Sequence, residues 1–163
     1  MRIGRKGAGL LGAATAAAVC TAVAAGAGAE VTKQRVAIVE RVSLAGGKST
    51  FELTPLTPGP MKADKGTLVP GGEFTGFITR EGLRIQIGNG TDTLSGANGS
   101  FRLTGPIEHV PIVGGYYVDT GTWALSAGTG VYARVSGSGR FAAVVLPSNR
   151  ILFRAEGFIR TAS

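Results

Sequence analysis

Hydrophobic and polar residues alternate with a period of two over much of the chain beyond residue 30. The clearest case is segment 121–141, where Trp123 and Leu125 alternate with small or polar residues up to a glycine-rich break at 127–130. Alternation resumes after this break, at 131–136. A period of two is typical of half-buried β-strands, so the segment predicts two strands joined by a hairpin. Gly137 and Gly139 fall within the second strand, where glycine suits a bend or a close approach of backbones.

The same alternation recurs along the chain, and no helical period interrupts it. Asn89-Gly90 and Asn98-Gly99 are predicted to form turns, and the proline-rich segment 55–66 a long loop. The pattern predicts an all-β fold, a single eight-stranded antiparallel closed barrel. Its expected strands cover residues 33–44, 49–54, 73–80, 83–88, 100–104, 116–126, 131–141 and 150–160.

Two glycine motifs carry a family resemblance. The turn Gly128-Thr129-Gly130-Val131-Tyr132, followed by Gly137-Ser138-Gly139, resembles the last hairpins of allene oxide cyclase-like and dirigent-like proteins. The segment Gly66-Thr67-Leu68-Val69-Pro70 is similar to a G-D-L-V-P segment of allene oxide cyclases, with Thr67 in place of the acidic residue. The resemblance covers residues 33 to 161 and implies a calycin-like barrel.

Residues 1–29 have the three parts of a signal peptide. Arg2, Arg5 and Lys6 precede a long uncharged run rich in alanine, which ends in the small residues Ala27-Gly28-Ala29. We therefore expect a secreted protein cleaved near Ala29, with residues 30–163 as one barrel domain and no integral membrane segment after processing. Cys20 would leave with the leader, so the mature chain would have no disulfide.

Composition excludes several function classes for the expected mature chain. It keeps 14 of the 17 basic residues against 10 acidic ones, a net charge of +4, and these charges are scattered, so nucleic-acid binding is not expected. A single histidine without cysteine does not make a typical zinc or copper site, and no phosphate-binding loop is present. We expect neither a metal nor another cofactor.

Glu40 is the first candidate site residue. It lies on the apolar side of the first predicted strand, together with Val36, Ile38, Val42 and Leu44. A carboxylate there either sits in water at the mouth of the barrel, pairs with an inward cation, or is held in the interior with a raised pKa. The resemblance to allene oxide cyclases implies a functional glutamate on the first strand, which makes Glu40 the candidate catalytic residue.

The second candidate group lies around the only histidine. Glu108-His109 lies between two prolines, and in the following strand Tyr117, Asp119 and Trp123 share one face. A histidine beside a carboxylate can act as an acid or base, and the face offers a hydroxyl, a carboxylate and an indole to a ligand. The alternative is an exposed loop histidine beside ordinary packing aromatics.

Three functions remain open for this sequence. The first is binding or steering of a small apolar ligand in the interior of the barrel, without a cofactor. The second, implied by the resemblance, is a cofactor-free isomerase or cyclase. The third is a structural or interaction protein whose interior is filled by side chains.

Overall fold

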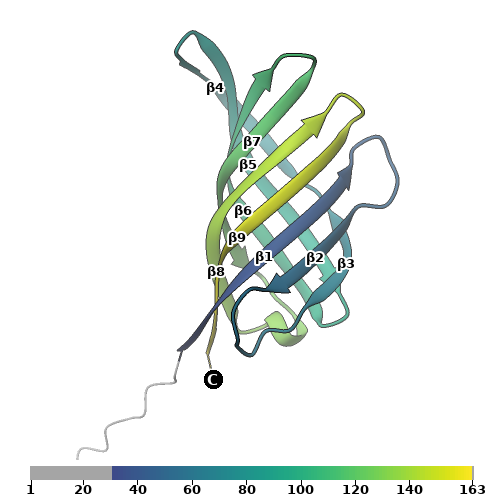
Figure 1. Cartoon of the computed structure of the whole chain (residues 1–163), viewed down its shortest axis with the longest axis vertical. Coiled ribbons are helices and arrows are strands. Elements are labelled where there is room, and N and C mark those ends of the chain that lie inside the picture. Colours follow the sequence, from purple (N-terminus) through teal and green to yellow (C-terminus); the bar gives the residue numbers. More distant parts are fainter. Residues whose placement is uncertain (1–30, 163) are drawn as a thin grey trace, which may run out of the picture.

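The computed structural model describes residues 31–162, which form an almost entirely β structure (Figure 1). The signal peptide predicted for residues 1–29 lies outside the described residues. Nine strands and one short 3₁₀ helix follow one another along the chain: β1 (Val31–Ser43), β2 (Thr50–Pro55), β3 (Asp64–Val69), β4 (Gly72–Arg80), β5 (Leu83–Gly96), β6 (Gly99–Ile112), β7 (Tyr116–Ser126), η1 (Gly130–Tyr132), β8 (Val135–Leu146) and β9 (Arg150–Ala162).

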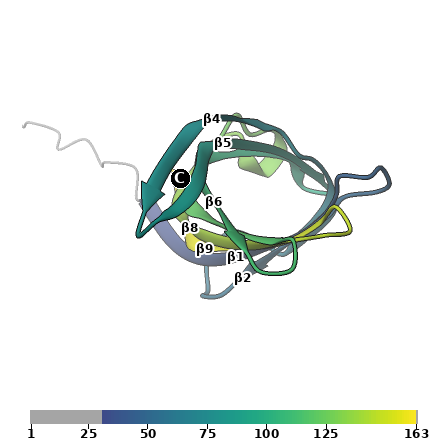
Figure 2. The same cartoon turned by 90° about the horizontal axis from the view of Figure 1, so that it is seen from above.

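The strands form one antiparallel sheet that closes in a ring. The order is β3-β2-β1-β9-β8-β7-β6-β5-β4, and a further pairing between β3 and β5 joins the two sides of the sheet. Figure 2 shows the ring from above. Strand β1 pairs with β9 along its whole length, which brings the first and last described strands together. The all-β antiparallel prediction is confirmed, although the structure has nine strands where eight were expected.

Strands β3 and β4 both pair with β5, and the register of pairing is the same at the end of β3 and at the start of β4. Val69 pairs with Thr93 and, after the short break at Pro70 and Gly71, Gly72 pairs with Gly90. A bulge between Phe74 and Gly76 then shifts the register of β4 by one residue. The loop predicted for residues 55–66 ends earlier than expected, because β3 already begins at Asp64.

Asn89-Gly90 does not form the predicted turn, because it lies inside the long strand β5. A Cβ atom at Gly90 would lie 2.7 Å from the Cδ1 atom of Ile107 on β6. This glycine therefore serves close packing in the interior, a requirement that an Asn-Gly pair does not reveal in the sequence. The turn predicted at Asn98-Gly99 is displaced by one residue: Ala97 and Asn98 form the turn, and Gly99, at a φ of 133°, begins β6.

The hairpin predicted around 127–130 is also different in detail. Residues Gly130–Tyr132 form η1, and β8 begins only at Val135, so the alternation at 131–134 does not belong to a strand. The Tyr132 side chain is fully buried, and its hydroxyl donates a hydrogen bond to the Asp64 carboxylate at 2.8 Å. Burial of this aromatic ring explains why the chain leaves the sheet here.

One end of the interior is filled by side chains, and we call it the packed end. Here Phe101 lies against Phe51 and Tyr132, with ring centroids 5.7 and 4.5 Å apart, and Met61 is buried beside them. The Gln34 side chain holds the loop before β3, because its amide donates to the carbonyls of Thr57 and Met61 and accepts from the Met61 N–H. The packed end therefore has little room for a ligand.

Candidate functional site

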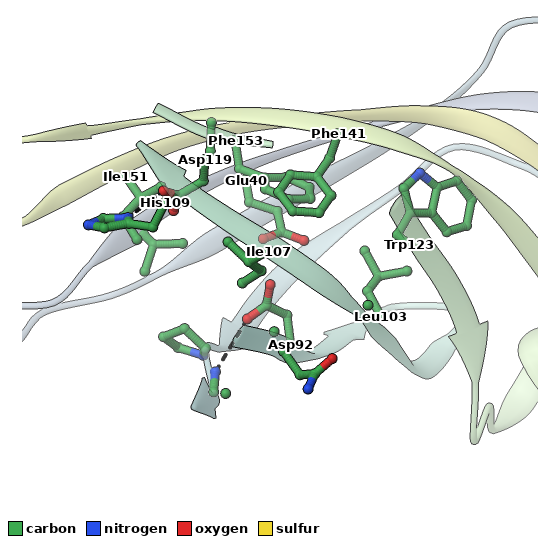
Figure 3. A pocket seen from close by; sticks show the side chains of 18 of the residues that line it. Glu40, Asp92, Leu103, Ile107, His109, Asp119, Trp123, Phe141, Ile151 and Phe153 are labelled. Atoms are coloured by element: carbon green, nitrogen blue, oxygen red, sulfur yellow. Dashed lines mark hydrogen bonds and ion pairs between the residues drawn. The ribbon is translucent and has the colours of Figure 1, made fainter. Parts of the chain in front are cut away.

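The other end of the interior, which we call the hollow end, contains a cavity of about 360 Å³. Its walls are apolar side chains from β1, β6, β8 and β9, among them Val42, Leu103, Ile107, Phe141, Ala143, Val145, Ile151 and Phe153. Phe141 and Phe153 stack with ring centroids 4.9 Å apart. Figure 3 shows five of these side chains around the space between Trp123 at one end and His109 at the other: Leu103, Ile107, Phe141, Ile151 and Phe153. The volume lies near the lower limit for small-molecule pockets.

Trp123 forms the floor of the cavity, towards the packed end. Its indole N–H donates to the carbonyl of Glu156 at 3.3 Å, and the side chain is 3% exposed. A Cβ atom at Gly139 or Gly157 would lie 2.7 Å from the indole ring. The glycine predicted to allow a close approach in β8 therefore makes room for this tryptophan.

Glu40 is placed in the cavity by the alternation of β1. Its neighbours on the adjoining strands are Phe51 of β2 and Phe153 of β9, so its side chain points inward with an apolar residue on each side. The residue is 1% exposed, and neither carboxyl oxygen has a hydrogen-bond partner among the described residues. Of the three alternatives left open by the sequence, the structure has the interior carboxyl.

Burial, with a smaller contribution from the nearby Asp92 carboxylate, raises the pKa of Glu40 from its ordinary 4.5 to about 9. Figure 3 shows the two carboxyl groups pointing towards each other across the cavity. Asp92 accepts a hydrogen bond from the Gly71 N–H at 3.3 Å, in the break between β3 and β4, and burial raises the pKa of Asp92 as well. At neutral pH Glu40 is therefore a neutral acid that can donate its proton to a hydrogen bond.

Asp92 was not predicted from the sequence. The Asn89-Gly90 pair was interpreted as a turn, which removed the following residues from the strand pattern. Gly90, Asp92 and Leu94 share one parity, and Leu94 is fully buried, so the alternation alone could have placed Asp92 inside.

His109 and Asp119 lie together at the end of the cavity opposite Trp123. His109 Nδ1 and an Asp119 carboxylate oxygen are 2.5 Å apart, and each side chain is 13% exposed. The imidazole stacks on Tyr117, with ring centroids 4.1 Å apart, and contacts Phe74 on another side, at 5.1 Å. His109 is not in a loop, because β6 continues through both prolines to Ile112.

Burial raises the pKa of Asp119, and the hydrogen bond with His109 opposes this effect. Of the predicted ligand-binding residues, His109, Asp119 and Trp123 line the cavity, and Tyr117 supports the imidazole from behind. Glu108 does not join them. It lies on the opposite face of β6, where it makes a two-pronged ion pair with Arg80 at 2.9 and 3.0 Å.

The cavity thus brings together a neutral acid, a carboxylate and a histidine–aspartate pair within apolar walls. Such groups can donate or accept hydrogen bonds and can move a proton on a bound molecule. Among residues 31–162, no three histidine, cysteine, aspartate or glutamate side chains gather in a way that could hold a metal ion. Nor does this part of the chain contain a helix long and apolar enough to cross a membrane.

Comparison of the chain with protein-family models, with curated proteins and with solved structures gave no match. The segment similar to G-D-L-V-P forms most of β3 and ends at Pro70, which lines the cavity. The Thr67 side chain, at the position of the acidic residue, is exposed and follows the outward parity of β3.

Proposed function

We propose that the protein is exported and binds a small, mainly apolar ligand in the cavity at the hollow end, without a cofactor. The observation that carries this proposal is Glu40, a buried carboxyl group without a hydrogen-bond partner that points into a space with apolar walls. A buried polar group of this kind costs folding free energy, so it is expected to serve a ligand.

The proposal includes a fold and a family. We infer that β3 and β4 together occupy one position of an eight-stranded barrel, since both pair with β5 in a single register interrupted only at Pro70 and Gly71. An eight-stranded barrel has an interior wide enough for one small ligand. This arrangement supports membership of the allene oxide cyclase-like barrels, and the signal-peptide pattern supports secretion.

A second candidate function is a cofactor-free isomerase or cyclase. It is favoured by the presence of an acid, Glu40, and of the His109–Asp119 pair in the same cavity, because the two could donate and remove protons at different atoms of one bound molecule. The third candidate, a structural or interaction protein with a filled interior, is less consistent with a cavity of about 360 Å³.

The single tryptophan gives a direct test of binding, because Trp123 lines the cavity. Titration with the uncharged probes phenylbutanol, cyclohexanol and decanol should change the Trp123 emission saturably for at least one probe. The same probe should raise the melting temperature, since a ligand at about 100 times its Kd adds about 2.7 kcal/mol to the unfolding free energy.

The matched variants are Ala143→Leu, which fills the cavity, and Ala142→Leu, which adds the same atoms to the exposed outer face of the same strand. Binding should be lost in the first and kept in the second. If no probe changes emission or melting, or if Ala143→Leu responds like Ala142→Leu, the cavity is not a binding site.

A further inference from the structure

The charges around the cavity are opposite in sign to the charge of the chain. The whole chain carries +7, yet four of its ten acidic residues line the cavity, namely Glu40, Glu73, Asp92 and Asp119. None of the cavity-lining residues is a lysine or an arginine, among the residues that the structure describes. Clefts lined by one sign of charge concentrate ligands of the opposite sign, so this cavity favours cations.

The strongest part of this field is the Glu40–Asp92 pair. Two carboxyl groups face each other, and the protein offers them one backbone N–H, that of Gly71, and no cationic side chain within the described residues. Burial raises the pKa of both groups, and the proximity of Asp92 adds to the rise for Glu40. A positive group between them would supply the missing hydrogen-bond donors and would favour the ionised form of Glu40, whose proton is then released to solvent.

The walls indicate what kind of cation fits. A metal ion such as Ca²⁺ needs six to eight oxygen ligands, which the apolar surroundings of Glu40 do not provide. Trp123, Phe141 and Phe153 instead present aromatic rings to the cavity, as does Phe74 at its rim. Aromatic faces attract organic ammonium groups and pack against apolar bodies.

We propose that the ligand of this cavity is a small organic amine, whose ammonium group lies between Glu40 and Asp92 and whose apolar body contacts Phe141, Phe153 and Trp123. This inference rests on the proposed binding function and specifies the ligand class. The ammonium group donates hydrogen bonds to both carboxyl groups, and the body fills the apolar part of the cavity.

The test compares three probes with one body and different head groups: phenylbutylamine, phenylbutanol and phenylbutyrate. Affinities are measured at pH 8 and constant ionic strength by Trp123 fluorescence and calorimetry. The amine should bind at least about tenfold more tightly than the alcohol, and the carboxylate most weakly, because a charge–charge contact in a buried site outweighs a neutral hydrogen bond.

Glu40→Gln and Asp92→Asn are the diagnostic variants, and Glu52→Gln is the control. Glu52 lies on the neighbouring strand β2, exposed to solvent. Each diagnostic variant should weaken amine binding by about thirtyfold or more. This factor is at the low end of the loss seen when one member of a buried charge pair is removed. Binding of the alcohol should be nearly unchanged. Glu52→Gln should leave both affinities unchanged.

The outcomes separate this inference from the proposed function. If the alcohol binds as tightly as the amine, or if the variants weaken both probes equally, the amine preference is wrong while a binding cavity remains. Stabilisation by calcium chloride without any response to the amine would also overturn it, in favour of a metal ion. If none of these probes and none of the uncharged probes binds, both proposals fail.

Discussion

The packed end and the hollow end each contain a buried carboxyl group, and the two groups are treated very differently. Asp64, 6% exposed, accepts hydrogen bonds from the backbone N–H groups of Lys65, Ala97 and Asn98 and from the Tyr132 hydroxyl. Glu40, 1% exposed, has no such partner among the described residues.

The two carboxyl groups therefore have different effects on the fold. A carboxylate with several donors fixes the elements that carry them, and Asp64 ties β3 to the turn before β6 and to η1. A carboxyl group without donors fixes no other element and lowers stability, and we therefore assign it to the proposed ligand. The surroundings of the two carboxyl groups also differ: Asp64 lies beside close-packed aromatic rings, whereas Glu40 lies beside the cavity.

The largest expected effect is the loss of Asp64. Asp64→Ala leaves two backbone donors of the turn and the Tyr132 hydroxyl without their acceptor, and should lower the free energy of unfolding by about 3 kcal/mol or more. Denaturant unfolding measures the loss. Tyr132→Phe, which removes one of these bonds, should cost about 1 kcal/mol. A loss for Asp64→Ala as small as that for Tyr132→Phe would contradict the structural role of Asp64.

Glu40→Gln should raise the free energy of unfolding rather than lower it, and the size of this effect should depend on pH. Because the pKa of Glu40 rises from 4.5 to about 9 on folding, the folded protein keeps a proton that the unfolded chain releases between these values. The wild-type stability contributed by this group is complete below about pH 4.5 and falls as pH rises to about 9, by at most about 1.4 kcal/mol per pH unit.

Glutamine cannot titrate, so the variant should match the wild type near pH 5 and be more stable at pH 8. Chemical unfolding of both proteins across this range checks the difference. Asp119 titrates in both proteins and cancels on subtraction, so the difference reports Glu40 together with its effect on the neighbouring Asp92. A variant that is less stable than the wild type at pH 8 would show that Glu40 has a structural partner after all.

The smallest effect is expected outside the cavity, at Glu108. Its ion pair with Arg80 lies on the surface, where both side chains are more than one third exposed. Glu108→Gln should change the unfolding free energy by no more than about 1 kcal/mol and should leave the Trp123 fluorescence response to ligands unchanged. Altered ligand affinity in this variant would show that Glu108 contributes to the binding site.

The sequence could predict the all-β class and the inward position of Glu40, because both follow from a period of two that needs no long-range information. Trp123 and Asp119 shared a face for the same reason. The pairing of β3 with β5, which closes the ring, could not be predicted, because local sequence patterns do not specify which strands pair with each other.

The candidate site was predicted only in part, for an equally physical reason. Parity places a side chain on one face of a strand but does not give its depth in the interior. The absence of a hydrogen-bond partner at Glu40 and the proximity of Asp92 could therefore not be predicted from the sequence. Glu108 and His109 are adjacent and therefore point to opposite faces of a strand, and this was concealed because the expected strands left residues 105–115 outside the sheet.

The most direct test of the account is the titration of the Glu40 carboxyl group itself. Carbon-13 NMR of glutamate-labelled protein, with Glu40→Gln to assign the resonance, follows its chemical shift against pH. We predict a pKa of about 9, because Glu40 is a buried acid without a hydrogen-bond partner beside the Asp92 carboxylate. A Glu40 resonance that titrates near 4.5 would contradict it, because Glu40 would then be a solvated or partnered carboxylate and the central contrast with Asp64 would disappear.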